Sequence, residues 1–173
     1  FEAPVAVPEE PYYGTSTVAP DGAVYFAGLA SFSSGIAVLR STNAQSSGTT
    51  VSFDQTVVVN LGGDIQGWGG PNPGGLLGQV WIASDHSDGP SRGYLYLLAS
   101  VDPPGSDPLD VHFSRSTDGG ATWTAPVRVN DDPTGSNAWQ WFGTMSVAPD
   151  GRVDVVWNDS RNDPGGYDSE LTY

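Results

Sequence analysis

Acidic, amide and aromatic side chains gather in a few segments of this 173-residue chain, and their types suit the binding of a carbohydrate. Flat aromatic faces stack on the C–H surfaces of sugars, whereas carboxylates and amides bind sugar hydroxyls. Two carboxylates at a sugar site are also the groups that glycoside hydrolysis uses. The sequence assigns no catalytic residue. The candidate ligand-binding residues are Asp131, Asp132, Trp139, Trp141, Asp159, Arg161 and Trp68.

Six of the seven candidates, all except Trp68, also have a purely structural interpretation, which the sequence leaves open. The acidic pair before Pro133 can simply shape a turn. Asp159 and Arg161 can form an ion pair that holds their own loop rather than a ligand. Trp139 and Trp141 fall on the same side of a strand, so they can equally pack in the core.

Metal chemistry finds little support in the residue spacing. Oxygen-rich loops are compatible with a calcium site among Asp131, Asp132 and Asp159, but no EF-hand-like spacing accompanies them. His86 and His112 stand alone in a chain without cysteine, so a zinc site is not expected. We therefore predict no metal and no cofactor.

Composition points to an all-β fold with an acidic surface. The 23 glycines and 14 prolines leave no uninterrupted stretch of helical periodicity, while alternating apolar runs recur between turn residues. The formal charge of −14 disfavours nucleic acid and anionic membranes as partners. No apolar run is long enough for a membrane span. The lack of cysteine is compatible with either redox compartment and favours a bacterial protein.

The chain contains a repeated hairpin. Val18–Val24 recurs as Val147–Val153, identical except that Arg152 replaces Ala23, and both copies centre on a Pro-Asp-Gly turn. A diverged third hairpin lies between them. The strands expected from these hairpins are Val24–Leu29, Val153–Trp157, Gln79–Ala83 and Tyr94–Ser100.

A second pattern, Ser116-Thr117-Asp118-Gly119-Gly120-Ala121-Thr122-Trp123, predicts another tight hairpin. Its acid can accept backbone N–H groups, and its glycines can take positive φ. The pattern S-x-D-x-G-x-T-W resembles the Asp-box, or BNR repeat, of sialidases and related β-propellers. The residues at its defining positions are Ser116, Asp118, Gly120, Thr122 and Trp123.

Fainter copies of the pattern extend the resemblance to both ends of the chain. One copy starts at Ser41, with Asn43 in place of the acid and Phe53 in place of the tryptophan. Residues 1–7 resemble the segment from Trp123 onward, and residues 170–173 resemble the strand that leads into the box. We therefore expect the chain to begin and stop at an Asp-box, as a fragment or as half of a paired assembly.

The resemblance implies an all-β fold, a β-propeller of about three four-stranded blades, forming part of a larger propeller or half of a six-bladed assembly. In such propellers the Asp-box is structural and lies at the end opposite the binding loops. The expected parts of this single segment are an outer strand at 1–7, blade one at 15–60, blade two at 79–130 and an incomplete blade three at 144–173.

The resemblance also implies a secreted or cell-surface bacterial protein that binds a glycan or polysaccharide. Sialidases clamp the substrate carboxylate with three arginines, but the Arg-Ile-Pro motif is absent, and only Arg161 and Arg92 map near the binding loops. Three functions stay open. They are a carbohydrate-binding module, a fragment of a sialidase-like glycoside hydrolase or polysaccharide lyase, and a structural module that assembles with itself or with missing blades.

Overall fold

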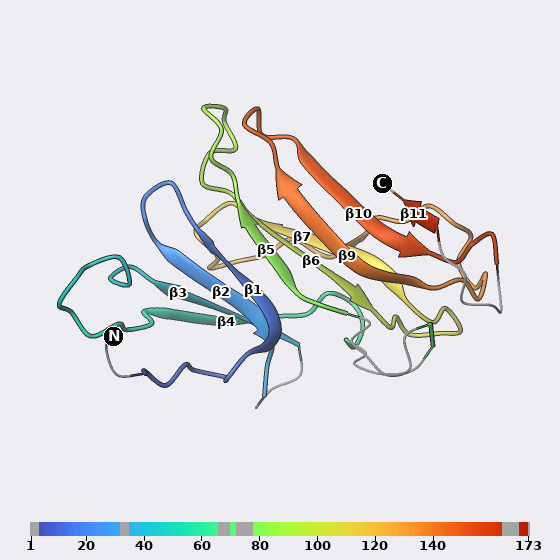
Figure 1. Cartoon of the computed structure of the whole chain (residues 1–173), viewed down its shortest axis with the longest axis horizontal. Coiled ribbons are helices and arrows are strands. Elements are labelled where there is room, and N and C mark those ends of the chain that lie inside the picture. Colours follow the sequence, from blue (N-terminus) through green and yellow to red (C-terminus); the bar gives the residue numbers. More distant parts are fainter. Residues whose placement is uncertain (1–3, 32–34, 66–69, 72–77, 164–169, 173) are drawn as a thin grey trace.

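A computed structural model describes residues 4–31, 35–65, 70–71, 78–163 and 170–172, and every regular element in these ranges is a β-strand (Figure 1). The all-β prediction is therefore confirmed. The strands are β1 (Tyr12–Val18), β2 (Val24–Leu29), β3 (Ile36–Ser41), β4 (Gln55–Val59), β5 (Trp81–Ser84), β6 (Leu95–Val101), β7 (Asp110–Ser116), β8 (Val127–Arg128), β9 (Gln140–Val147), β10 (Val153–Asp159) and β11 (Glu170–Thr172).

The strands form three antiparallel sheets that follow the order of the sequence. The first sheet has the order β1-β2-β3-β4, the second β5-β6-β7-β8, and the third β9-β10-β11. Each strand pairs with its neighbour along the chain, as expected for short connections between antiparallel strands. The strands of the three sheets span residues 12–59, 81–128 and 140–172, so the first and third sheets begin before the segments expected at 15–60 and 144–173.

The second sheet lies between the other two, and strand β6 shows why. All seven of its residues are buried, because alternate side chains face two different cores. Leu95 and Leu97 pack with the first sheet, in a cluster that includes Tyr25 and Val38. Leu98 faces the opposite way and packs with residues of the third sheet. The continuous apolar run of β6 is thus the signature of a strand covered on both faces.

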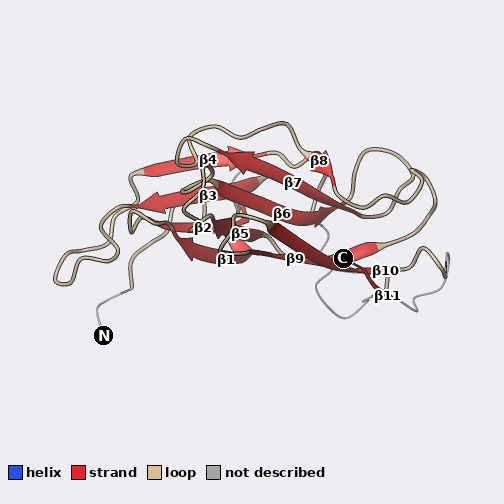
Figure 2. Ribbon diagram, turned by 90° about the horizontal axis from the view of Figure 1, so that it is seen from above, coloured by secondary structure: helices blue, strands red, loops and turns tan. Residues whose placement is uncertain are grey.

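The first strands of the three sheets are neighbours. Val80 N donates to Tyr13 O at 2.8 Å, and Thr15 Oγ1 donates to Val80 O at 3.2 Å while accepting from Ile82 N at 3.0 Å. Strand β9 in turn lies against β5 and β6. In Figure 2, β1, β5 and β9 lie toward one side of the molecule and β4 and β8 toward the other. The sheets are therefore arranged side by side with equivalent strands aligned.

This arrangement gives the molecule two distinct ends. The turn end carries the connections β1–β2, β3–β4, β5–β6, β7–β8 and β9–β10. The loop end carries the connections β2–β3, β4–β5, β6–β7 and β8–β9, together with the residues before β1 and after β10. His86 of the β5–β6 turn contacts Val18 O, which shows that neighbouring turns meet at the turn end.

The repeated hairpin has the same geometry in both copies, which confirms the prediction from the repeat. Gly22 N donates to Ala19 O at 2.8 Å, and Gly151 N donates to Ala148 O at 2.9 Å. The two glycines have φ values of 89° and 88°. In each copy the aspartate before the glycine accepts the backbone N–H two residues later, at 3.0 and 3.1 Å. Both turns lie at the turn end.

The Ser116–Trp123 turn closes on itself through its own side chains. Asp118 Oδ1 accepts from Ser116 Oγ at 2.8 Å and from Thr122 N at 2.9 Å, while Asp118 Oδ2 accepts from Thr122 Oγ1 at 2.6 Å. Gly120 N donates to Ser116 Oγ at 2.9 Å, and Trp123 Nε1 donates to Gly120 O at 3.1 Å. The hydrogen bonds that Thr122 and Ser116 donate to the carboxylate lower the pKa of Asp118 to about 2.

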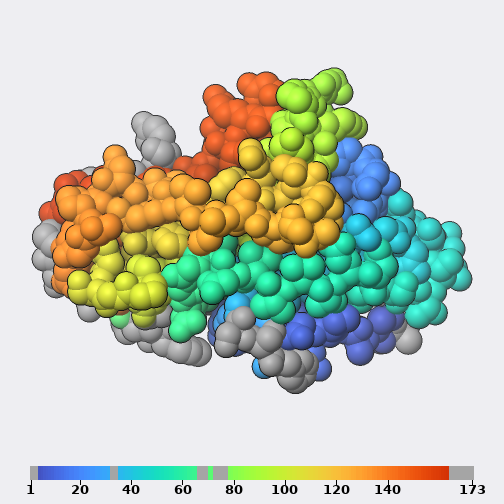
Figure 3. Space-filling model, turned by 180° about the vertical axis from the view of Figure 1, so that it is seen from behind, coloured from blue at the N-terminus to red at the C-terminus, as the bar shows by residue number. Residues whose placement is uncertain are grey.

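The first sheet contains the corresponding turn with an amide in place of the carboxylate. Asn43 Oδ1 accepts from Ser41 Oγ and from Ser52 N, each at 3.0 Å, and its Nδ2 donates to Thr50 O at 3.0 Å. The asparagine thus closes a longer loop that the aspartate pattern alone would not predict. Residues 121–126, which include the end of the Ser116–Trp123 turn and the residues just after it, lie beside β4 at the back of the molecule (Figure 3).

The N-terminal segment differs from the expected outer strand. Residues 4–11 form no strand, and residues 1–3 lie outside the described residues. Val7 instead packs against Leu39 and Phe53 on the outer face of the first sheet. An apolar side chain that is buried against a sheet face stabilises the fold without pairing to an edge.

Candidate functional site

The two described tryptophans of the candidate set are packing residues. Trp141 is only 6% exposed and lies in a small cluster with Leu109, with Trp139 packed beside it. Gly70 lies directly over the ring of Trp139, since a Cβ there would come within 2.6 Å of it. The core alternative therefore describes these rings better than sugar stacking. The third tryptophan, Trp68, lies outside the described residues.

Asp159 and Arg161 form an ion pair that holds the loop after β10. Arg161 Nε and Nη2 lie 2.9 and 2.8 Å from Asp159 Oδ2, and Arg161 N donates to Asp159 Oδ1 at 2.8 Å. Trp157 Nε1 and Gln140 Nε2 also donate to this carboxylate. Burial acts to raise the pKa of Asp159, but these donors outweigh it and the pKa lies below its ordinary value.

Asp131 completes this group from the β8–β9 loop. Its Oδ1 accepts from Arg161 Nη1 at 2.6 Å, and the arginine lowers the pKa of the Asp131 carboxyl. Because the Asp131 side chain is 85% exposed, water screens this pair far more than the pair with Asp159. Both carboxylates raise the pKa of Arg161, which stays charged.

A second charged group surrounds Arg128, which the sequence did not mark as a site residue. Arg128 Nε lies 2.6 Å from Asp110 Oδ1, its Nη2 lies 2.9 Å from Asp132 Oδ1, and Asp107 is 3.8 Å away. Asn130 Nδ2 donates to both Asp110 and Asp132. The Arg128 guanidinium therefore lies among three buried acids.

Gln140 joins the two charged groups into one network across two sheets. Its Oε1 accepts from Asn130 Nδ2 at 3.2 Å, and its Nε2 donates to Asp159 at 3.2 Å. The network runs from β7 and β8 in the second sheet to β9 and β10 in the third. Gln140 is fully buried, so its two bonds are made in a setting where an unpaired amide would be costly.

Asp107 is a buried acid at this end, and one of its carboxylate oxygens is left unbonded within the described part of the chain. It is 7% exposed, its Oδ2 accepts from Gly135 N at 2.8 Å, and its Oδ1 has no hydrogen-bond partner among the described residues. Burial raises the pKa of Asp107, and neighbouring Asp110 adds to the rise. A cavity of about 330 Å³ lies beside it.

The expected metal and arginine placements can now be compared with the geometry. Asp131, Asp132 and Asp159, which could have held calcium, bind arginines instead, and the described ranges contain no group of three acidic or histidine side chains placed to hold a metal. Arg92 does not lie near the binding loops. It belongs to the β5–β6 turn at the turn end, where it donates to His86 O and Ser87 O.

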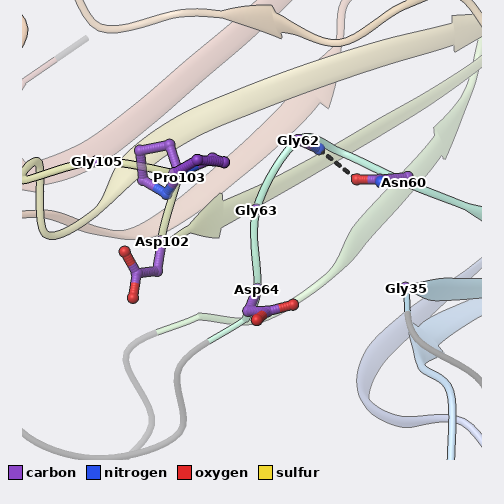
Figure 4. A pocket seen from close by; sticks show the side chains of 9 residues that line it. Gly35, Asn60, Gly62, Gly63, Asp64, Asp102, Pro103 and Gly105 are labelled. Carbon is purple, nitrogen blue, oxygen red and sulfur yellow. Dashed lines mark hydrogen bonds between the residues drawn. The ribbon is translucent and has the colours of Figure 1, made fainter.

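An open groove lies at the loop end between the first and second sheets (Figure 4). It has a volume of about 590 Å³, and its lining includes Asn60, Asp64 and Asp102. The backbones of Asp64 and Asp102 pair, with N···O distances of 3.1 and 2.7 Å. The approach requires glycine at position 63, because a Cβ there would lie 2.3 Å from Asp102 O. Carboxylate and amide groups thus line a groove that no arginine enters.

Among the described residues, three exposed aromatic residues lie at the loop end outside the list of candidate ligand-binding residues. Tyr12, Tyr13 and Phe142 are 43%, 37% and 37% exposed, at the starts of β1 and β9. Tyr13 and Phe142 also have positive φ values, 52° and 54°. The sequence could have marked Tyr13 and Phe142 as equivalent positions, because the hairpin repeat extends backward to Tyr13-Gly14-Thr15 and Phe142-Gly143-Thr144.

Comparison with known proteins adds no family to this picture. Neither the models of known protein families nor the curated proteins contain a match to the sequence. Within the described ranges, the structure has no helix that could cross a membrane.

Proposed function

We propose that this chain is an arc of a β-propeller whose loop end binds a neutral carbohydrate. The propeller is supported by three antiparallel sheets in sequence order and by the alignment of their first strands β1, β5 and β9. In a propeller, the first strands of successive four-stranded blades line the central channel. The self-closed Ser116–Trp123 turn, which resembles an Asp-box, agrees with this arrangement.

The observation that carries the carbohydrate proposal is the groove of about 590 Å³ lined by Asn60, Asp64 and Asp102. Carboxylate oxygens bind hydroxyl groups, and Asn60, whose Oδ1 accepts from Gly62 N at 2.7 Å, offers its Nδ2 as a donor. The exposed rings of Tyr13 and Phe142 at the same end suit sugar C–H faces. At the opposite end, the Asp-box-like turn and the paired Pro-Asp-Gly turns are closed by their own hydrogen bonds.

The ion pairs of the two loop-end arginines favour a neutral sugar over an anionic one as the ligand. Arg128 and Arg161, the two arginines at the loop end, are each bound by at least two carboxylates. Neither can release a guanidinium for a ligand carboxylate without leaving a buried aspartate unpaired. With a formal charge of −14, the protein repels anions further. A sialidase-like activity is therefore disfavoured. We favour an exported bacterial protein whose ligand is a neutral glycan.

A binding panel tests this proposal. The protein is titrated with cellobiose, maltose, mannobiose and chitobiose, and with 3′-sialyllactose as the anionic comparison. Asp64→Ala removes a groove carboxylate, and Asp88→Ala removes an exposed carboxylate at the turn end as the matched control. We expect saturable binding of at least one neutral disaccharide, weakened about tenfold by Asp64→Ala alone. Binding of sialyllactose only, or no binding, would refute the proposal.

An assembly role is the second candidate, because the outer face of the first sheet is apolar. Val18, Phe26 and Val58 on this face are 51%, 37% and 42% exposed. Another sheet of the same propeller, from a second copy, could cover them at the spacing of packed sheets. Analytical ultracentrifugation of the protein and of Phe26→Ser tests this role. A protein that stays monomeric at all concentrations would rule out the assembly role.

A further inference from the structure

The two exposed rings at the loop end occupy equivalent positions in the internal repeat. Tyr13 and Phe142 each precede a Gly-Thr pair and stand five residues before the repeated Val-Ala-Pro-Asp-Gly hairpin. Each ring is 37% exposed, and the two φ values differ by only 2°. The strand pairing shifts register at both places. In the first sheet the shift lies between Tyr12 and Thr15, and in the third sheet it lies between the pairs of Trp141 with Asn158 and of Thr144 with Val156. The same aromatic bulge is therefore built twice in one chain.

Both bulges hold a bulky residue in a backbone conformation that favours glycine. A left-handed φ costs a residue with a Cβ on the order of 1 kcal/mol, and such residues gather where a side chain must be aimed at a ligand. The next residue supports each bulge. A Cβ at Gly14 would overlap Ala27 O, and one at Gly143 would lie 3.2 Å from Val111. Within the described ranges, the second sheet has no such residue at the start of β5.

The surroundings of Tyr13 suit a sugar ring. A cavity of about 360 Å³ is lined by Tyr12, Tyr13, Ser16 and Phe26. The rings of Tyr12 and Tyr13 meet edge to face at 4.9 Å between centroids, which fixes their relative orientation. A fixed aromatic surface beside an exposed hydroxyl is the combination that sugar recognition uses.

We propose that the two bulges are equivalent sugar-binding subsites, with Tyr13 and Phe142 as the stacking residues. This proposal rests on the proposed function, because it concerns the same neutral ligand class at the same end of the molecule. It adds that one chain binds the ligand at two places of one kind, related by the internal repeat. In this proposal the groove between the first and second sheets binds hydroxyl groups, and the two bulges bind ring faces.

Glycine substitutions give a direct test. Tyr13→Gly and Phe142→Gly each remove a ring while placing a residue that accepts φ near 50°. Val127→Ala, which trims a 60% exposed side chain on β8, is the control. The ¹⁵N-labelled protein is titrated with the four neutral disaccharides, and the amide signals of Gly14 and Gly143 report on each bulge separately.

We expect both glycine amides to shift with the same disaccharide, at midpoints that agree within about threefold. Tyr13→Gly should abolish the shift at Gly14 and leave that at Gly143, and Phe142→Gly should do the reverse. Each variant should melt within about 5 °C of the parent, because strain relief offsets lost packing.

The outcomes separate this proposal from the broader one. Shifts at the groove amides of Gly62 and Gly63, without shifts at Gly14 and Gly143, would overturn the subsites and leave the carbohydrate proposal intact. No shift anywhere would overturn both. A large fall in melting temperature in both glycine variants, with binding unchanged, would make the rings packing residues and overturn the subsites.

Discussion

Replacing Asp159 by asparagine should destabilise the fold far more than the same change at Asp131, although both carboxylates bind Arg161. The Asp159 side chain is 1% exposed and the Asp131 side chain 85% exposed. Asp159 accepts from Arg161, Trp157 and Gln140, and an asparagine amide would turn two N–H donors toward these N–H groups.

The magnitude follows from the burial of this pair. Breaking a buried ion pair from one side costs about 3–5 kcal/mol, and hydrogen bonds to charged groups contribute about 1.5–3 kcal/mol each. Asparagine retains one carbonyl oxygen, and Arg161 keeps Asp131, so we expect the low end of the range, about 3 kcal/mol. An exposed pair is screened, so Asp131→Asn should leave stability nearly unchanged.

Urea unfolding of the parent and of both variants at pH 7 measures the difference. The pKa of Asp159 is lowered in the fold, so its contribution is present above the ordinary carboxyl pKa, about 3.9, and is lost as the pH falls through the folded value. Asp159→Asn should therefore flatten the loss of stability below about pH 4. Equal unfolding midpoints for Asp159→Asn and Asp131→Asn would refute the reasoning.

Two further predictions concern the Ser116–Trp123 turn. The Asp118 carboxyl should titrate in the folded protein at a pKa of about 2 by NMR, so its stabilising effect is lost only as the pH falls toward that value; titration near 3.8 would contradict the hydrogen bonds assigned to it. Gly120→Ala should lower the free energy of unfolding by about 2 kcal/mol, because φ is 82° and a Cβ would lie 3.2 Å from Gln55. Gly48→Ala is the control, since φ is 76° there but no atom lies within 4 Å of the added Cβ, and it should lower the free energy of unfolding less. Equal losses in the two variants would show that crowding by Gln55 is unimportant.

The sequence predicted the strands well wherever repeats and turn residues marked them. Val24–Leu29 was placed at the observed bounds, and the paired Pro-Asp-Gly turns have matching hydrogen bonds. The expected strand at 1–7 is absent from residues 4–7. Similarity to a strand elsewhere in the chain does not form one without an edge to pair with, and Val7 finds apolar cover on a sheet face instead.

The candidate site was predicted by residue type, and the structural alternatives named for it describe the Asp159–Arg161 ion pair and the packing of Trp139 and Trp141. Asp159 and Asp131 do lie together at the loop end, yet they bind Arg161, and Asp132 binds Arg128. Local spacing cannot show that Arg128 reaches acids of the β6–β7 and β8–β9 loops, because that meeting depends on the sheet. Alternation places Trp141 and Phe142 on opposite faces of β9, but it does not show which of the two faces is buried.

The self-closure of the Ser116–Trp123 turn also orders the events of folding. Its bonds join residues at most four apart, so closing it costs little chain entropy, and a hairpin of this kind forms within microseconds. The bonds of Gln140 to Asn130 and of Arg161 to Asp131 span 10 and 30 residues, and they form only when the third sheet docks on the second. The register of β7 and β8 is therefore set early at the turn end. We therefore expect the loop end, where the ligand is proposed to bind, to become ordered after the turn end.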